Sequence, residues 1–274
     1  MSAFDPRSPR LKPALGKRPL GAVWFTLGSV VLLEVAARHR PDAVVIDMQH
    51  GLFDRLSLEA AVASAGAPTL VRTRDDAPAS IGEALDAGAE GVIVPLVESA
   101  TAAQAVASAC RYPPDGTRSG GGIRPLADFG AHSAHANGGI VAGVMIETAS
   151  GVTHAAEIAR SGVDLVFVGT GDLALSLGTE PGSAAHAEAC TAVLTACREA
   201  KVPCGVFAMD GASAAARIRQ GFDLAVAAID LNAFEAAIRS ETSTFRAEAS
   251  PPAKTTANRP ARKRPKKRND ADDG

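Results

Sequence analysis

Short apolar runs alternate with amphipathic stretches along most of the chain. Eight runs rich in β-branched residues predict buried strands, at residues 22–28, 43–48, 69–73, 91–97, 140–147, 164–169, 202–208 and 223–229. Between them, Ala-rich stretches with apolar residues at helical intervals predict helices at 30–39, 55–66, 79–89, 100–111, 151–162, 184–200 and 211–221. Several of these helical stretches end in glycine, a common helix terminator.

The strands are continuously apolar, which indicates a parallel sheet covered on both faces. Eight strand–helix units predict an α/β protein with a single (β/α)8 TIM barrel at residues 20–245. A doubly wound open sheet would show the same alternation. However, the first strand-to-helix turn, "LGSVVLLE", lacks the complete GxGxxG pattern of dinucleotide-binding folds. Residues 1–19 would then be an N-terminal extension.

Charge separates the C-terminal end from the rest of the chain. Residues 246–274 contain nine of the 28 Lys and Arg but four of the 30 Asp and Glu, which leaves 19 against 26 in residues 1–245. This Pro-, Lys- and Arg-rich segment has almost no large apolar residues, so we expect a disordered basic tail. The acidic body, with one Trp and one Tyr, makes a nucleic-acid partner unlikely except through this tail.

Composition also bears on the compartment. The chain has no apolar stretch long enough for a signal peptide or a membrane helix, so we expect no membrane partner. The four cysteines, Cys110, Cys190, Cys197 and Cys204, form no CxxC pair or zinc spacing and are expected to be reduced and buried. Both observations favour a cytoplasmic protein.

In a β/α barrel the chemistry occurs at the C-terminal ends of the strands. The polar residues at these positions are Asp47, Gln49 and His50 after the second strand, Arg72 and Arg74 after the third, Glu147 after the fifth and Asp172 after the sixth. The histidines within helices, His39, His154 and His186, lie outside this set and are expected at the surface.

Glu147 and Asp172 follow adjacent predicted strands and offer only oxygen ligands, which suit Mg²⁺, Mn²⁺ or Co²⁺. Either carboxylate alone is equally well explained as a helix cap or an ion-pair partner. Asp172 lies in "FVGTGDLALSLG", where Gly169 and Gly171 allow a tight turn at the start of a short helix, and the amides of that turn suit a carboxylate or phosphate.

His50 is the natural general base, because its imidazole titrates near neutral pH. Asp47, or Asp86 from the following helix, is expected to hydrogen-bond the ring and raise its basicity, although Asp86 is also explained as a plain surface acid. Arg72 ends an apolar strand, where a guanidinium requires an anion as partner. Together, these groups indicate a site for a small 2-oxo acid.

Five motifs resemble, in order and spacing, the metal-dependent pyruvate aldolases of the HpcH/HpaI aldolase and citrate lyase family. They are "DAVVIDMQHGLFD", "TLVRT", "EALDAGAEGVIVPLVESATAAQAVASACRYPPDGTRSGGG", "VMIETASGV" and "GVDLVFVGTGDLALSLG". The resemblance implies a lyase that cleaves a 4-hydroxy-2-oxo acid, such as 4-hydroxy-2-oxo-heptanedioate or a 2-dehydro-3-deoxy sugar acid. The products would be pyruvate and an aldehyde, formed through a metal-bound pyruvate enolate. It also implies a homo-oligomer, often a hexamer.

The resemblance assigns roles to individual residues. Glu147 and Asp172 would bind the metal, His50 would be the base, Asp86 would raise its basicity and Arg72 would stabilise the transition state. The backbone of Gly171 and Asp172 would hold the substrate carboxylate, with Thr170 and Gln49 as further substrate contacts.

The chain departs from the family pattern at three positions. Gln49 stands where Glu is common, Met145 where a substrate-binding Gln is common and Thr170 where Pro is usual. These departures leave the identity of the substrate open. Two alternative functions also remain: a citramalyl- or malyl-CoA lyase-like enzyme, and a catalytically impaired barrel that acts as a binding protein.

Overall fold

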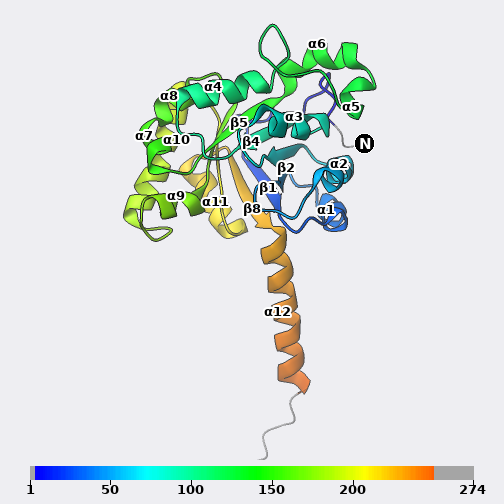
Figure 1. Ribbon diagram of the computed structural model, residues 1–274. Helices are drawn as coiled ribbons and strands as arrows, with labels where there is room; N and C mark the ends of the chain where they lie inside the picture. The colour runs from blue at the N-terminus through cyan, green and yellow to red at the C-terminus, as the bar shows by residue number, and fades with distance from the viewer. Residues whose placement is uncertain (1–3, 250–274) are drawn as a thin grey trace, which may run out of the picture. The chain divides into compact units, whose positions relative to one another are not determined.

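The structure, a computed structural model, describes residues 4–249 and confirms a closed parallel β/α barrel (Figure 1). Each strand pairs in parallel with the next along the chain, and β8 pairs with β1. The strands are β1 (Leu20–Phe25), β2 (Ala43–Asp47), β3 (Thr69–Arg72), β4 (Gly91–Val94), β5 (Val141–Ile146), β6 (Leu165–Val168), β7 (Cys204–Val206) and β8 (Leu224–Ile229). All eight predicted strands therefore exist.

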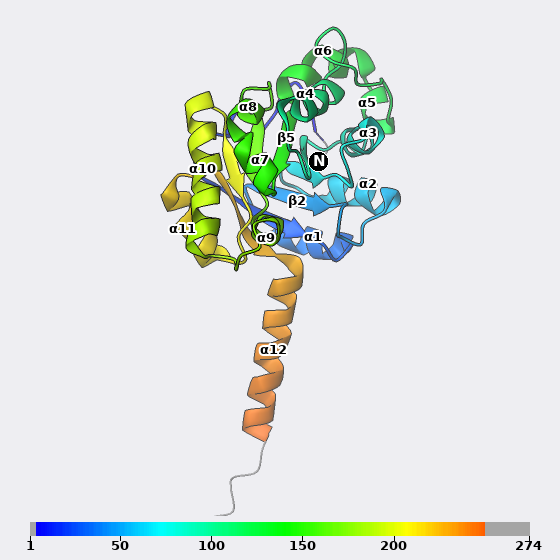
Figure 2. The ribbon, with the colours of Figure 1, turned by 60° about the vertical axis from the view of Figure 1, so that its left-hand side comes forward.

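Helices surround the barrel, with α10 and α11 on one side and α1 and α2 on the other (Figure 2). Their bounds are α1 (Val30–Ala37), α2 (Arg55–Ser64), α3 (Pro78–Asp86), α4 (Ala100–Ala109), α5 (Ile123–Leu126), α6 (Phe129–Gly139), α7 (Ala149–Thr153), α8 (Ala155–Ala159), α9 (Thr170–Ser176), α10 (Ala184–Ala200), α11 (Gly211–Gln220) and α12 (Asp230–Ala249). The sequence analysis predicted the short helix α9 after the Gly169–Gly171 turn, but it did not predict α5, α6 or α12. Of these, α6 contains two adjacent glycines and no regular apolar stripe, which explains why it was missed.

The core has two layers, because successive side chains of a strand point to opposite faces. Val45 and Leu70 point into the barrel, whereas Val44 and Ile46 pack against the outer helices. Residues two positions further along share the inward direction, so Asp47 and Arg72 end their strands on the inner face. Met145 is also in the inner layer, which places Glu147 on the same side.

The N-terminal extension packs against the barrel. Leu11 and Leu15 are buried and belong to the inner layer of the core. Glu90, which precedes β4, is also buried, and its carboxylate accepts the backbone N–H of Leu11 at 3.0 Å. Because β4 begins next to Glu90, these contacts lie at the N-terminal ends of the strands, away from the predicted site.

The chain divides after Glu235 into two compact units. Helix α12 begins in the first unit and continues to Ala249, so residues 246–249 are helical, whereas the sequence predicted a tail beginning at 246. The remainder of that predicted tail lies outside the described residues. Within the described part of the chain, no helix has the length and apolar character needed to span a membrane.

Candidate active site

A cavity of about 340 Å³ opens at the C-terminal ends of the strands. It brings together most of the residues that the sequence predicted: His50, Asp47, Arg72, Glu147, Thr170, Gly171 and Asp172. Trp24, Thr26, Met145, Gly169, Leu175 and Phe207 complete its lining. Polar groups from five different strand ends therefore meet in one place, as the barrel topology predicts.

Asp47 is the centre of a hydrogen-bond network. Its Oδ1 accepts from Nε of Arg72 at 2.9 Å, and its Oδ2 accepts from Nη2 of the same guanidinium. Nε1 of Trp24 also donates to Oδ2, at 3.3 Å. The ring of Trp24 lies under the guanidinium of Arg72, with Cζ 5.1 Å from the ring centroid. Because β2 and β3 pair Asp47 directly with Arg72, the strand register itself sets up this forked ion pair.

Burial would raise the pKa of Asp47, but the hydrogen bonds and charge of Arg72 outweigh it, so the pKa lies below its ordinary value. The carboxylate is therefore ionised and holds Arg72 in one orientation. Only Nε and one proton of Nη2 are used in this pair, so the other Nη protons remain for a ligand.

The structure corrects one part of the predicted role of Asp47. We expected its carboxylate to hydrogen-bond the ring of His50, but it accepts the backbone N–H of His50 at 3.2 Å. No hydrogen bond among the described residues involves the imidazole, which is exposed and lines the cavity. The loop turns tightly at the next residue, where a Cβ on Gly51 would lie 2.1 Å from the carbonyl oxygen of Asp47. The ring of His50 is thus available to a ligand.

Glu147 is buried, and two local features aim its carboxylate. Its Oε1 accepts the backbone N–H of Leu96 at 2.8 Å. Leu96 has a φ of 57°, a left-handed conformation that is rare for a leucine and that suggests a functional constraint. On the other side, a Cβ on Gly169 would lie 2.5 Å from Oε2 of Glu147, so glycine is required there.

Burial, followed by the negative charge of Asp172, raises the pKa of Glu147, although the Leu96 amide acts in the opposite direction. Two neighbouring carboxylates in a buried site repel each other unless a cation or a proton lies between them. Oxygen ligands of this kind fit a hard divalent cation. In the described part of the chain, no three or more His, Cys, Asp or Glu residues lie together in a group that could hold a metal ion.

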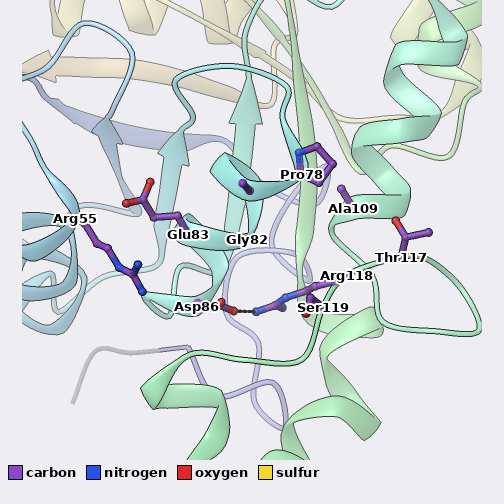
Figure 3. Close-up of a pocket in the computed structure, with 10 residues that line it drawn as sticks. Arg55, Pro78, Gly82, Glu83, Asp86, Ala109, Thr117, Arg118 and Ser119 are labelled. Carbon is purple, nitrogen blue, oxygen red and sulfur yellow. Dashed lines mark hydrogen bonds and ion pairs between the residues drawn. The ribbon is translucent and has the colours of Figure 1, made fainter.

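Asp86 does not approach His50 within the chain. It ends α3, which runs back from the strand ends, so it does not line the active-site cavity. Its Oδ1 instead accepts from Nη2 of the buried Arg118 at 3.0 Å. Figure 3 shows this pair in a separate cavity, together with Arg55 and Glu83. The helix direction thus explains why the predicted contact is absent.

Gln49 and His186 also differ from expectation. Gln49 does not line the cavity, and its Oε1 is buried without a partner among the described residues. His186, expected at the surface, is buried with 1% of its surface exposed, whereas His39 and His154 are exposed as expected. All four cysteines are free and buried, as predicted.

The sequence analysis missed several residues that line or shape the site. Trp24, Thr26, Leu175 and Phe207 line the cavity, and Leu96 orients Glu147. Trp24 could have been found from its position in the sequence. It is the only tryptophan of the chain and lies near the end of a strand, where barrel sites form. The sequence analysis considered Gln49 and the ionisable groups at the strand ends, and so it left out the apolar, aromatic and hydroxyl-bearing residues at the same positions.

Known proteins resemble the chain over most of its length. It is 38% identical over 239 residues to a hydroxypyruvate/pyruvate aldolase of Rhizorhabdus wittichii, covering 84% of this chain and 95% of the relative. It is 32% identical over 234 residues to a 5-keto-4-deoxy-D-glucarate aldolase of Salmonella newport, covering 81% and 91%. A crystal structure of a HpcH/HpaI aldolase/citrate lyase family protein from Burkholderia cenocepacia superposes with a TM-score of 0.83 at 32% identity, covering 87% of this chain and 100% of the other.

The family model itself matches residues 21–237, which span the barrel and the cavity described above. The relatives are named as aldolases, which are carbon–carbon lyases, so the chain is assigned to this class of enzyme. The chain belongs to the HpcH/HpaI aldolase/citrate lyase family.

Proposed function

We propose that the protein is a divalent-metal-dependent aldolase that cleaves a 4-hydroxy-2-oxo acid into pyruvate and an aldehyde. The observation that carries this proposal is the convergence of the Glu147 and Asp172 carboxylates with Arg72 and His50 in one cavity. A relative at 38% identity is named hydroxypyruvate/pyruvate aldolase, which supports pyruvate as the part of the substrate that the site retains.

Glu147 and Asp172 would hold Mg²⁺, Mn²⁺ or Co²⁺. Such a cation, when bound, would polarise the 2-oxo group and stabilise the negative charge that develops as the carbon–carbon bond breaks. The raised pKa of Glu147 supports the assignment, because a buried carboxylate beside a second one is stabilised as an anion by a cation.

The remaining residues handle the proton and the charge. The exposed ring of His50 takes the proton of the 4-hydroxyl, because neither ring nitrogen is engaged by the described residues. Arg72, held rigidly by Asp47, offers its free Nη protons to the oxygen that becomes negative. Thr170 and the backbone of Gly171 and Asp172 face the cavity, where they would receive the substrate carboxylate.

A lactate-dehydrogenase-coupled assay tests this proposal with a panel of 4-hydroxy-2-oxo acids. We expect pyruvate release with Mg²⁺, Mn²⁺ or Co²⁺ and its loss after treatment with a chelator. Glu147→Ala should abolish release while leaving the circular dichroism spectrum unchanged. Release that survives chelation contradicts metal dependence, and no release from any acid of the panel contradicts the lyase itself.

We also propose that the protein is a homo-oligomer in which copies exchange α12. An apolar groove lies on the outside of the first compact unit, lined by Val23, Phe25, Leu32 and Val35 and, at one end, by Phe234 from the first turns of α12 itself. Helix α12 carries exposed apolar residues at helical spacing, namely Leu231, Phe234, Ile238 and Phe245, which form one stripe. Both the groove and the stripe are apolar, so the stripe of one copy could pack into the groove of another.

The chain connection favours a second copy as the source of the helix. Strand β8 ends at Ile229 and α12 begins at Asp230, whereas the connections after β1, β2 and β3 span residues 26–29, 48–54 and 73–77. The chain therefore passes directly from β8 into α12, without a loop in which it could reverse direction. The carboxylate of Asp230 also fixes the start of the helix, because it accepts the backbone N–H groups of Thr26 and Leu27.

We also propose that the protein is cytoplasmic. Its four cysteines are free and buried, which supports a reducing compartment.

A further inference from the structure

His186 is a buried titratable residue that the proposed chemistry does not use. It lies in the first turn of α10, and its two ring nitrogens bind two different segments of backbone. Nδ1 accepts the N–H of Gly182 at 3.1 Å, and Nε2 lies 2.9 Å from the carbonyl oxygen of Thr170. Burying an imidazole is costly unless both nitrogens are satisfied, and here both are.

These partners fix the protonation of the ring. A backbone N–H can only donate, so Nδ1 must accept, and a carbonyl oxygen can only accept, so Nε2 must carry the proton. The neutral imidazole is therefore a rigid bridge with an acceptor on one side and a donor on the other. Its two contacts enclose α9, because Thr170 begins this helix and Gly182 follows it.

Helix α9 carries Asp172, one of the two proposed metal-binding carboxylates, two residues after Thr170. The helix is only seven residues long, so its own hydrogen bonds hold it weakly. Few other polar contacts hold it in place. Thr170 Oγ1 donates to the carbonyl of Phe207 at 3.3 Å, and Ser176 Oγ accepts the N–H of Ala149 at 3.0 Å.

We infer that His186 is a positioning residue, which holds the carbonyl of Thr170 and thereby fixes Asp172 opposite Glu147. This inference rests on the proposed function, since it assigns His186 to the geometry of the same carboxylate pair. A positioning role differs from a purely structural one in its effect on metal binding. If His186 positions Asp172, removing its ring nitrogens should weaken metal binding even in protein that remains folded.

The test uses binding of Mn²⁺ alone to metal-free protein, measured by isothermal titration calorimetry. His186→Phe keeps the ring but removes both nitrogens, and we expect the Kd for Mn²⁺ to rise about tenfold. Hydrogen exchange of the amides in residues 170–176 should accelerate in the same variant. The matched control is His132→Phe, at another buried histidine that packs against Phe4 and Tyr112 and does not line the cavity. Its Kd should stay within twofold of wild type.

An unchanged Kd and unchanged exchange in His186→Phe overturn the inference. A second measurement needs no variant: in wild-type protein, Mg²⁺ titration should shift the ¹⁵N resonance of His186 Nε2 but not that of His132. Resonances of His186 that do not respond to Mg²⁺ also overturn it. If wild-type protein binds neither Mn²⁺ nor Mg²⁺, both the proposed function and the inference are contradicted. If the wild type and His186→Phe bind the ion equally well, only the inference is contradicted.

Discussion

At the scale of single residues, the site depends on side chains that are held before any substrate arrives. Arg72 has two of its donors engaged by Asp47 and its flat face against Trp24. This arrangement needs a planar fork, because the two donors must match the two carboxylate oxygens. An ammonium group would replace the guanidinium donor to one oxygen of Asp47 and leave the other oxygen without that donor.

Arg72→Lys is therefore expected to lower kcat on the order of 10- to 100-fold although the charge is kept. The coupled pyruvate assay measures the change. Arg74→Lys serves as the control, because Arg74 pairs with Glu83 at the surface and does not line the cavity. A near-normal kcat in Arg72→Lys removes the residue from the mechanism.

A second residue-scale effect concerns stability and pH. Burial, followed by the charge of Arg118, lowers the pKa of His132 to about 4 from its ordinary value of 6.5. Between these two values the unfolded chain binds more protons than the folded one, so stability falls as pH drops through that window. The contribution of neutral His132 to the free energy of unfolding is fully present above about pH 6.5 and is lost as the pH falls to about 4.

Between pH 7 and 4.5 we expect this histidine to account for about 2 kcal/mol of lost unfolding free energy, at 1.36 kcal/mol per pKa unit. His132→Phe lacks the titration and should lose less stability over the same interval. Urea unfolding of both proteins at several pH values measures the difference. Parallel curves for the two proteins would show that the ring does not titrate in this way.

At the scale of elements, the series of apolar runs that marks the strands made much of the site predictable. It placed Asp47, Arg72 and Glu147 at strand ends, and the barrel topology then brought them together. The sequence could not show that Asp47 binds Arg72 in preference to the ring of His50, because that depends on the register between β2 and β3. The burial of His186 also escaped prediction, because it depends on where the loop before α10 meets α9.

The turn between β6 and α9 can be tested for its effect on the carboxylate of Glu147. A Cβ at Gly169 would lie 2.5 Å from Oε2 and 2.8 Å from Cβ of Glu147, so the whole side chain of Glu147 would have to shift. We expect Gly169→Ala to raise the Kd for Mn²⁺ at least about tenfold. Gly171→Ala is the control, because a Cβ there meets nothing within 4 Å. Equal affinities in the two variants contradict this account of the turn.

At the scale of the whole molecule, the apolar groove over β1 and β8 is the feature that a single copy leaves unexplained. Exposed apolar surface of this kind commonly marks an interface. The sequence did not predict α12, because its apolar stripe is narrow and the rest of the helix is polar. The prediction of a homo-oligomer came only from the family resemblance.

Ile238→Asp should dissociate the oligomer, because it places a charge in the apolar stripe of α12. Sedimentation velocity measures the change in mass. Ser240→Asp is the matched control, since residue 240 is exposed and lies half a turn away, on the opposite side of the helix. Wild-type protein that sediments as a monomer contradicts the proposed exchange of helices.

The pairing of β1 with β8 has a consequence for how the protein forms in the cell. Strand β1 hydrogen-bonds to a partner that begins at Leu224, so this seam joins residues about two hundred positions apart in the chain. During synthesis, β1 to β4 leave the ribosome long before the strand that completes the ring exists. The first strand therefore remains an open edge until β8 has been synthesised, which makes the nascent protein vulnerable to aggregation at that edge.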